Sequence, residues 1–440
     1  IAWRNLVKNK IFSVANIVGL TCAFAVSILL TMTALFELSF DQFHLNKDSA
    51  YQVYLTNQTP RGAETSTSNP VPLASALKEE VPGIKRITRT LSEDALISFN
   101  DKDLDLDAEY VDAEFFNIFT FPVIAGNTGN PLPSKNAVSI TEETATKMFG
   151  NTDVVGKVVQ VQIGGEEHPF TIASILENTP PNSSIDFDIV IPFENHPEYE
   201  SNKDVWNSQF HPVYLQLEDG MTPQQFEINS RAFANLHYKG SIESDKRDGA
   251  SPDENGQYKQ FHLLPVKDLH FATFKEGLVD TAHTFPYLIL GVALVIIFIV
   301  CANFINMNIA LSEKRLKEIG MRKTLGAVKK QLFFQFWMES LIVFLIAIGL
   351  GLLVSNLLIG PFKTLFVTKA TFANVTRPGI IALFVISIFV ITLIAGGYPA
   401  LILSKLSTLR ALKGKLDFGK NRLRNGLIVL QFVIAIILIS

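Results

Sequence analysis

The sequence predicts an α-helical membrane protein with a large α+β domain on the outer side of the membrane, between the first and second transmembrane helices. Hydrophobic residues make up 48% of the 440 residues and charged residues only 18%, whereas charged residues make up about 25% of an average soluble protein. Long uncharged blocks occur towards both ends of the chain, and a charge-rich segment separates the first block from the second. Together these observations indicate helices that cross a bilayer and one large domain outside it.

Each uncharged block is long enough to cross a bilayer, which needs about 20 apolar residues. The four complete blocks lie between Lys10 and Glu37, Asp280 and Glu313, Glu339 and Lys363, and Arg377 and Lys405. A fifth block begins after Arg424 and is still apolar at Ser440. We therefore expect four complete transmembrane helices and the start of a fifth, in a fragment whose second half is missing.

Positively charged residues predict the orientation, because Lys and Arg are concentrated in cytoplasmic loops. They precede the first block and are frequent after the second and fourth blocks. The amino terminus is therefore expected inside, and residues 40–285 are expected outside. Residues 37–285 carry 38 acidic and 18 basic side chains, a negative balance that excludes nucleic acid as an expected partner.

These features divide the chain into four expected parts. The first comprises an interfacial helix and the first transmembrane helix, and the second is the external domain. The third contains helices two to four with a cytoplasmic loop at 312–331, and the fourth is a cytoplasmic linker with the start of helix five. Their ranges are 1–39, 40–285, 286–404 and 405–440. A simple positively charged anchor is the alternative to the interfacial helix at Ile1 to Phe12.

Within the external domain, hydrophobic periodicity predicts both strands and helices. Alternation predicts strands at Asp101 to Asp107 and at Val158 to Ile163, whereas helical spacing with helix-starting residues marks Pro72 to Val81 and Thr141 to Phe149. The segment from Ser241 to Gln260 is polar and lacks apolar periodicity, so it is expected to be a flexible loop.

Small residues and one proline predict sites of close helix packing. In the first block they recur every four residues, a spacing that lets another helix approach. At the end of the fourth block, two glycines and a proline predict a kink or a close crossing. The predicted packing residues are Gly19, Ala23, Ser27, Gly396, Gly397 and Pro399.

No catalytic or metal-binding motif is complete. Gly150 to Val158 resembles a phosphate-binding loop, but five residues separate its glycines instead of four and Val158 replaces the required hydroxyl. Asp103 to Glu114 resembles a calcium loop without its turn glycine, so a strand with one wet face is the preferred interpretation and calcium the alternative. The eight histidines form no metal or nucleophile motif, and Cys22 and Cys301 lie in apolar blocks.

The loop after the second block carries the most specific sequence pattern. From Glu318 to Ala327 it reads Glu-Ile-Gly-Met-Arg-Lys-Thr-Leu-Gly-Ala. This run resembles the signature of FtsX-like ABC permeases, the family that includes MacB-like macrolide exporters and lipoprotein-releasing permeases. Supporting matches lie at Ala2 to Leu6, Phe40 to His44, Met148 to Gly150, Val155 to Lys157 and Tyr398 to Ala400.

The resemblance implies that residues 40–285 form a MacB-type periplasmic core domain and that the loop contacts a separate cytoplasmic ABC ATPase. From the residues themselves, we expect Gly320 and Gly326 to break the helix and leave a short basic piece that presents Arg322 and Lys323 to a partner. The alternative is a loop whose charge only fixes orientation. The residues implied in coupling are Glu318, Gly320, Arg322, Lys323, Leu325, Gly326 and Ala327.

The resemblance also implies a function. The chain is expected to be a non-enzymatic permease subunit in a bacterial inner membrane, without a cofactor of its own, because ATP and magnesium are bound by the partner ATPase. It would couple ATP hydrolysis to export or extraction of a lipophilic substrate: a drug, lipid, lipoprotein or peptide. Further expected partners are a second permease half or an identical copy, membrane lipids, a periplasmic adaptor and an outer-membrane channel. The alternative is an FtsX-like signalling module that regulates an external partner without transport.

Overall fold

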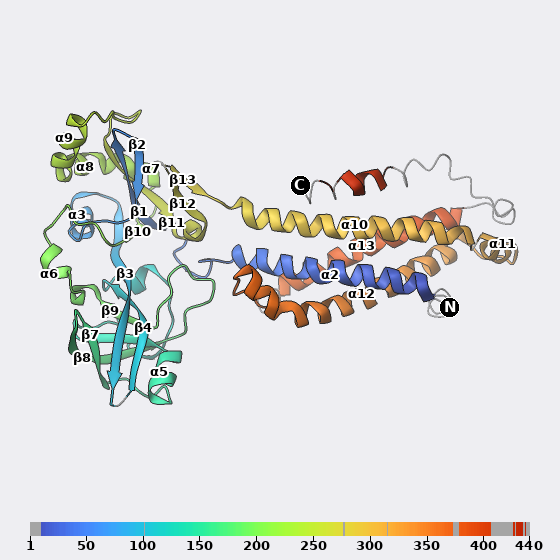
Figure 1. Ribbon diagram of the computed structural model, residues 1–440, viewed down its shortest axis with the longest axis horizontal. Helices are drawn as coiled ribbons and strands as arrows, with labels where there is room; N and C mark the ends of the chain where they lie inside the picture. The colour runs from blue at the N-terminus through green and yellow to red at the C-terminus, as the bar shows by residue number, and fades with distance from the viewer. Residues whose placement is uncertain are drawn as a thin grey trace. The chain divides into compact units, whose positions relative to one another are not determined.

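The computed structural model describes residues 10–100, 102–275, 278–314, 316–372, 378–405, 426, 428–433 and 436. Most of the predicted interfacial helix, and the predicted linker from residue 406 to 425, lie outside these residues. The predicted fifth helix is described only in part, with helical residues at 428–433. The chain forms two compact units (Figure 1): a helical unit, Ile1–Leu38 with Thr284–Ser440, and an α+β domain, Ser39–His283.

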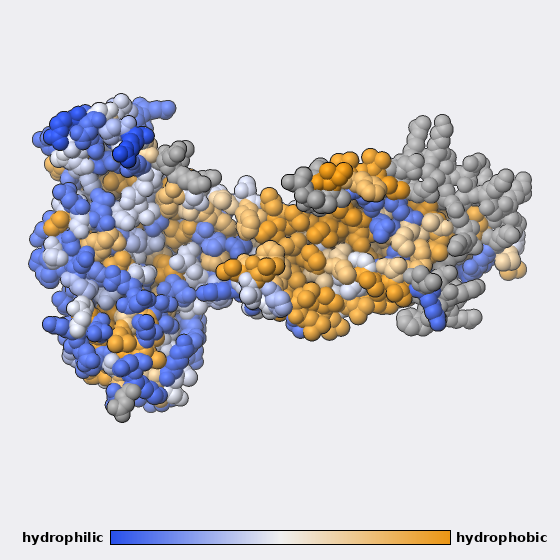
Figure 2. Space-filling view, viewed as in Figure 1, coloured by the Kyte–Doolittle hydropathy of each residue, from blue (hydrophilic) through white to orange (hydrophobic). Residues whose placement is uncertain are grey.

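The helical unit is built from long apolar helices. Among the described residues, four helices are long and apolar enough to cross a membrane. They are α2 (Lys10–Glu37), α10 (Thr284–Lys314), α12 (Lys329–Phe366) and α13 (Pro378–Lys405), with the short α11 (Leu316–Thr324) between α10 and α12. Each long helix covers one of the four complete uncharged blocks, except that α10 begins at Thr284, three residues after the second block begins. Figure 2 shows a mainly hydrophobic surface on this unit and a mainly hydrophilic one on the α+β domain, which fits helices solvated by lipid.

Aromatic packing joins three of these helices. Phe344 of α12 is fully buried, and the centroid of its ring lies 4.9 Å from that of Phe304 in α10 and 6.0 Å from that of Phe24 in α2. Edge-to-face contacts at these distances are favourable in addition to the burial of area. The three rings belong to the hydrophobic core of the helical unit.

The α+β domain contains one large mixed sheet flanked by short helices. The strands are β1 (Ala50–Thr59), β2 (Gly62–Ser66), β3 (Ile84–Phe99), β4 (Lys102–Val111), β5 (Val123–Gly126), β6 (Ala137–Thr141), β7 (Val158–Ile163), β8 (Glu166–Leu176), β9 (Ile189–Pro192), β10 (Val213–Leu217), β11 (Lys259–Pro265), β12 (Ala272–Lys275) and β13 (Leu278–Thr281). The helices are α3 (Leu73–Glu80), α4 (Phe115–Ile118), α5 (Glu142–Phe149), α6 (Tyr199–Asn202), α7 (Pro223–Asn229), α8 (Arg231–His237) and α9 (Lys239–Arg247), with 3-10 helices η1 (Phe193–Asn195) and η2 (Val266–Phe271).

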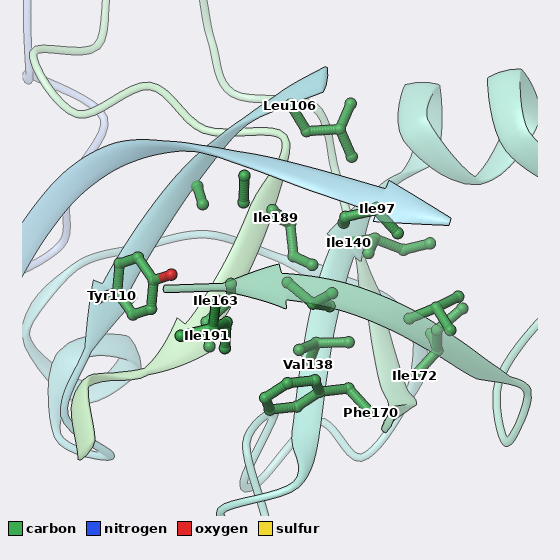
Figure 3. Close-up of a cluster of buried hydrophobic side chains, with 14 of the residues drawn as sticks. Ile97, Leu106, Tyr110, Val138, Ile140, Ile163, Phe170, Ile172, Ile189 and Ile191 are labelled. Atoms are coloured by element: carbon green, nitrogen blue, oxygen red, sulfur yellow. The ribbon is translucent and has the colours of Figure 1, made fainter. Parts of the chain in front are cut away.

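The long strand β3 links two hydrophobic cores. The sheet order is β11-β1-β10-β3-β4-β9-β6-β8-β5, with β2 paired to β1, β7 paired to β3 and β8, and a separate hairpin of β12 and β13. The first part of β3 pairs with β10 and its later part with β4. One core lies around β1, β10, β11 and α7 to α9. The other, shown in Figure 3, includes Ile97, Val138, Phe170 and Ile172.

The structure confirms four of the predicted elements of this domain. The two predicted helices appear as α3 and α5, and the two predicted strands as β4 and β7. Helix α5 begins where the Thr141 side chain accepts a hydrogen bond from the Thr144 N–H, and it ends at Gly150 in the left-handed conformation. In β4 the acidic residues alternate with Leu104 and the buried Leu106, as a strand with one wet face requires.

The prediction of a flexible loop from Ser241 to Gln260 is wrong at both ends of that segment. Residues up to Arg247 belong to α9, and β11 begins at Lys259. Helix α9 is held by one buried side chain, Ile242, which shares a core with Tyr238. The Lys259 ammonium lies 2.5 Å from Asn57 Oδ1 and 3.6 Å from Asp245 Oδ2. A single apolar anchor and a buried lysine produce no hydrophobic periodicity, so the pattern did not show these elements.

A buried carboxyl group on β4 predicts a pH-dependent stability of the α+β domain. Burial raises the pKa of Glu109 from 4.5 to about 7, and hydrogen bonds from the Ser92 and Thr90 side chains offset this only in part. The folded domain therefore binds an extra proton between the unfolded and folded pKa values. Its free energy of unfolding should fall as the pH rises through that window, by a few kcal/mol.

Replacing Glu109 with Gln should remove this decline. We expect urea unfolding of residues 39–283 to show wild-type stability falling between pH 5 and pH 8, and the Glu109→Gln variant losing much less. The same decline in both proteins would show that Glu109 does not bind the proton.

Candidate coupling site

Helix α11 ends in a glycine turn that leads into α12. Gly326 has a φ of +94°, a conformation that favours glycine. Its N–H donates to the Lys323 carbonyl at 3.1 Å, and the Ala327 N–H donates to the Arg322 carbonyl at 3.0 Å. This pair of bonds is the Schellman ending of a helix. The predicted break at Gly326 is therefore confirmed.

The predicted break at Gly320 is wrong. Gly320 lies within α11 and is buried. Glycine in a helix interior costs only about 1 kcal/mol relative to alanine, and here the neighbouring Leu316 and Ile319 are almost fully buried. Ile319 packs in a small core whose other buried members are Leu332, Phe336, Ala400 and Leu403. Burial of these side chains outweighs the low helix propensity of one glycine.

The side chains of Arg322 and Lys323 are bound within the helical unit, whereas the sequence led us to expect them to face a partner. Arg322 Nη2 lies 2.5 Å from Glu318 Oε1, and its Nη1 donates to Gln335 Oε1 of α12 at 2.6 Å. Lys323 Nζ donates to the Ser404 carbonyl at the end of α13, at 2.7 Å. Charge-assisted bonds of this kind are stronger than neutral ones. They fasten α11 to α12 and α13.

The exposed surface of this region is apolar at its centre. The Leu325 side chain is 87% exposed, and Met321 and Val328 are each more than half exposed. Lys329 and Lys330 are exposed beside them. We call these five residues the α11 tip. Of these apolar residues only Leu325 was predicted as a site residue, although Met321 and Val328 are also apolar residues within a short, strongly charged loop, which is a usable signal.

Gly396, one of the predicted packing residues, lies at a close approach between α13 and α12. A Cβ atom at Gly396 would lie 2.5 Å from the Cβ of Ser340, so only glycine fits without a shift. At Gly397 the nearest atoms would be 3.6 Å or more away, which is ordinary contact. Pro399 is buried within α13, which continues to Lys405.

Of the three small residues predicted for packing in α2, two are buried and one is exposed. Ala23 and Ser27 are buried, and Ser27 Oγ donates to the Ala293 carbonyl of α10 at 3.2 Å. Gly19 is exposed, and a Cβ atom there would meet nothing within 4 Å. The contact therefore involves two of the three predicted residues.

A close approach to α2 that was not predicted from the sequence lies at Gly351 of α12. A Cβ atom at Gly351 would lie 2.9 Å from Phe24 Cβ and 3.4 Å from the Thr21 carbonyl. Gly351 lies between Ala347 and Ser355 at spacings of four, and all three residues are buried. The rule that was applied to α2 would have found this face.

Two family models match the chain. The MacB-like periplasmic core domain matches residues 13–231, and the FtsX-like permease C-terminal region matches residues 290–408, which include α11 and its tip. The chain belongs to the FtsX-like, MacB-like family of ABC transporter permeases. Members of this family provide the membrane permease part of ABC transporters.

Bacterial relatives match most of this chain at low identity. The chain is 24% identical over 357 residues to the macrolide export ATP-binding/permease protein MacB of Pasteurella multocida, covering 80% of this chain and 50% of the relative. It is 23% identical over 280 residues to the ABC transporter permease YknZ of Bacillus subtilis, covering 62% of each chain. The permease thus spans about half to three fifths of the length of these curated relatives.

A solved domain of a permease protein from Porphyromonas gingivalis also resembles this chain. The TM-score is 0.41 and the sequence identity 20%, and the likeness covers 56% of this chain and 98% of that one.

Proposed function

We propose that this permease couples ATP hydrolysis by a separate cytoplasmic ABC ATPase to export or extraction of a lipophilic substrate, by mechanical transmission to the α+β domain. One observation carries the proposal: an exposed tip with three apolar side chains lies where the short helix α11 turns into α12, and α11 is bonded to α12 and α13. Apolar side chains surrounded by polar ones are typical of binding surfaces. The ATPase is the partner that would cover this tip, and it would bind the ATP and magnesium.

The contacts around α11 provide a route for the motion. The Arg322–Gln335 bond moves α12 with α11, and the Lys323–Ser404 bond does the same for α13. Helix α12 packs on α2 through Gly351, and α2 continues along the chain into the α+β domain at Ser39. Packed helices transmit such displacements because well-packed interiors are hardly compressible. In this proposal Arg322 and Lys323 bind α11 to α12 and α13, and Leu325 contacts the ATPase.

The proposal extends to the substrate class and to further partners, and the names of the relatives support its choice of substrate. Relatives are named macrolide exporters, so a macrolide is the first substrate to test, followed by lipids, lipoproteins and peptides. The chain would act with a second permease half or an identical copy, in contact with membrane lipids and with a periplasmic adaptor and outer-membrane channel. The alternative, a signalling module, is less favoured because the α+β domain is large, from Ser39 to His283.

Reconstitution of the full protein with the ATPase that purifies with it tests this function. In proteoliposomes, we expect ATP-dependent movement of erythromycin or of a fluorescent lipid analogue, and stimulation of ATP hydrolysis by the transported compound. If ATP hydrolysis depended on the permease but no compound moved, the signalling alternative would replace transport.

The proposed orientation places the amino terminus and α11 in the cytoplasm and the α+β domain outside. We predict that an impermeant thiol reagent labels Lys239→Cys on intact spheroplasts, whereas Lys329→Cys is labelled only after permeabilisation. Both lysines are exposed, and Cys22 and Cys301 are replaced by alanine in both variants. Labelling of Lys329→Cys on intact spheroplasts, without labelling of Lys239→Cys, would reverse the orientation.

A further inference from the structure

The chain that follows α2 enters the α+β domain through a residue with an unusual backbone. Asp41 has a φ of +56°, a backbone conformation that residues other than glycine seldom adopt, and it is only 1% exposed. Such a conformation persists only where the surrounding structure holds it. Asp41 belongs to the Phe40 to His44 run, which neither the α11 tip nor the helix packing involves.

Asp41 is held by a loop between β8 and β9. Its carboxylate accepts hydrogen bonds from the Ser184 N–H at 2.8 Å and from the Ser184 hydroxyl at 2.5 Å. Its own N–H donates to the Asn182 carbonyl at 3.0 Å. The Asn182 side-chain amide in turn donates to the Ser39 carbonyl at 2.7 Å. These four bonds join the first residues after α2 to residues 182–184.

The end of α4 and the loop that follows it are bound by the next residues. His44 Nδ1 accepts a hydrogen bond from the Thr120 N–H at 3.0 Å. Burial lowers the pKa of His44 to about 4, so the ring is neutral at physiological pH. The Leu45 N–H donates to Thr120 Oγ1 at 2.9 Å, and the Asn46 side-chain amide donates to the Asn117 carbonyl at 3.0 Å.

The same segment contacts the part of the domain that leads to α10. The Phe40 ring stacks on the His270 ring, with centroids 3.4 Å apart and an interplanar angle of 8°. His270 lies in η2, which is followed directly by β12 and β13 and then by α10 from Thr284. The chain that leaves α2 is thus tied close to the segment that leads to α10.

We propose that Ser39 to Asn46 forms a latch, with Asp41 as its central positioning residue, that transmits displacement of α2 to residues 117–120 and 182–184. The latch deepens the proposed function and rests on it. Residues 182–184 connect β8 to β9, which both lie within the large sheet, so a latch that stays closed makes the sheet follow α2. An open latch would leave α2 to move without the domain.

Three variants distinguish the loss of the Asp41 hydrogen bonds from the relief of backbone strain at a positive φ. Asp41→Gly removes the carboxylate and suits the positive φ. Asn100→Gly is the matched control, because Asn100 has a φ of +52° and is exposed in the same domain. Ser184→Ala removes only the hydroxyl donor and is the milder variant. All are made in the full permease in nanodiscs with its copurified ATPase, and hydrogen exchange is compared with and without a non-hydrolysable ATP analogue.

In the wild type, we expect the nucleotide to change exchange at residues 117–120 and 182–184. Asp41→Gly should raise exchange at the Ser184 amide about tenfold or more, since hydrogen bonds to charged groups are lost. It should also abolish the nucleotide response of both loops, while Ser184→Ala weakens that response and Asn100→Gly keeps it. A full nucleotide response in both Asp41→Gly and Ser184→Ala would overturn the latch. If the wild-type α+β domain showed no response at all, mechanical transmission would fail and the latch with it.

Discussion

Replacing Leu325 with aspartate should weaken binding of the ATPase about 30-fold or more, without changing the stability of the permease. The Leu325 side chain is 87% exposed, so the fold loses almost no buried area. In the complex, an apolar anchor at the centre of an interface contributes about 2 kcal/mol or more, which corresponds to about 30-fold in affinity. A carboxylate buried there without a partner would cost still more.

Leu236→Asp is the matched control for this variant. Leu236 is 66% exposed in α8 of the α+β domain, where no ATPase contact is proposed. Titration of detergent-solubilised permease with the ATPase should give a wild-type dissociation constant for Leu236→Asp and a much larger one for Leu325→Asp. Equal affinities for the two variants would remove the α11 tip from the interface.

Replacing Gly396 with alanine should destabilise the helical unit, because overpacking usually costs about 1 to 3 kcal/mol. The added methyl group would lie 2.5 Å from Ser340 Cβ, so α13 and α12 would have to separate. Alanine also favours the helix by about 1 kcal/mol over glycine, and that gain offsets part of the cost.

Gly349→Ala isolates the steric effect. Gly349 lies within α12, and a Cβ atom there meets nothing within 4 Å, so this variant gains helix propensity without a clash. We expect the thermal unfolding midpoint in detergent to fall for Gly396→Ala and to stay level or rise for Gly349→Ala. If both midpoints rose together, the close approach of α13 to α12 would not constrain residue 396.

The sequence predicted the transmembrane helices well because charge is excluded from a bilayer over a fixed length. It also located the turn at Gly326, where only backbone conformation matters. It misplaced the partners of Arg322 and Lys323, because these are Gln335 and Ser404, and loop charge alone does not show contacts with distant residues. An exposed lysine and one bonded to a helix end have the same sequence pattern.

Other features were visible in the sequence but their roles were not. The run from Phe40 to His44 was recognised as a family match, yet Asp41 acquires its role from Ser184, which lies 143 positions further along the chain. Helix α9 was not predicted, because Ile242 is its one buried residue and a single apolar residue gives no helical periodicity. Gly351 needed no contact information at all, since its spacing from Ala347 and Ser355 follows the rule that was applied to α2.

Cross-linking from Thr324, the last residue of α11 and a neighbour of the α11 tip, tests most directly whether α11 docks on the ATPase. Thr324→Cys places an exposed thiol beside Leu325, in a permease whose Cys22 and Cys301 are replaced by alanine. With a short cross-linker that carries a maleimide for the introduced thiol and an active ester for lysine amines of the ATPase, applied to native membranes, we expect one product that contains the ATPase and whose yield changes with ATP. Lys405→Cys, at the end of α13, should give far less of this product. Strong cross-linking from Lys405→Cys with none from Thr324→Cys would contradict coupling through α11.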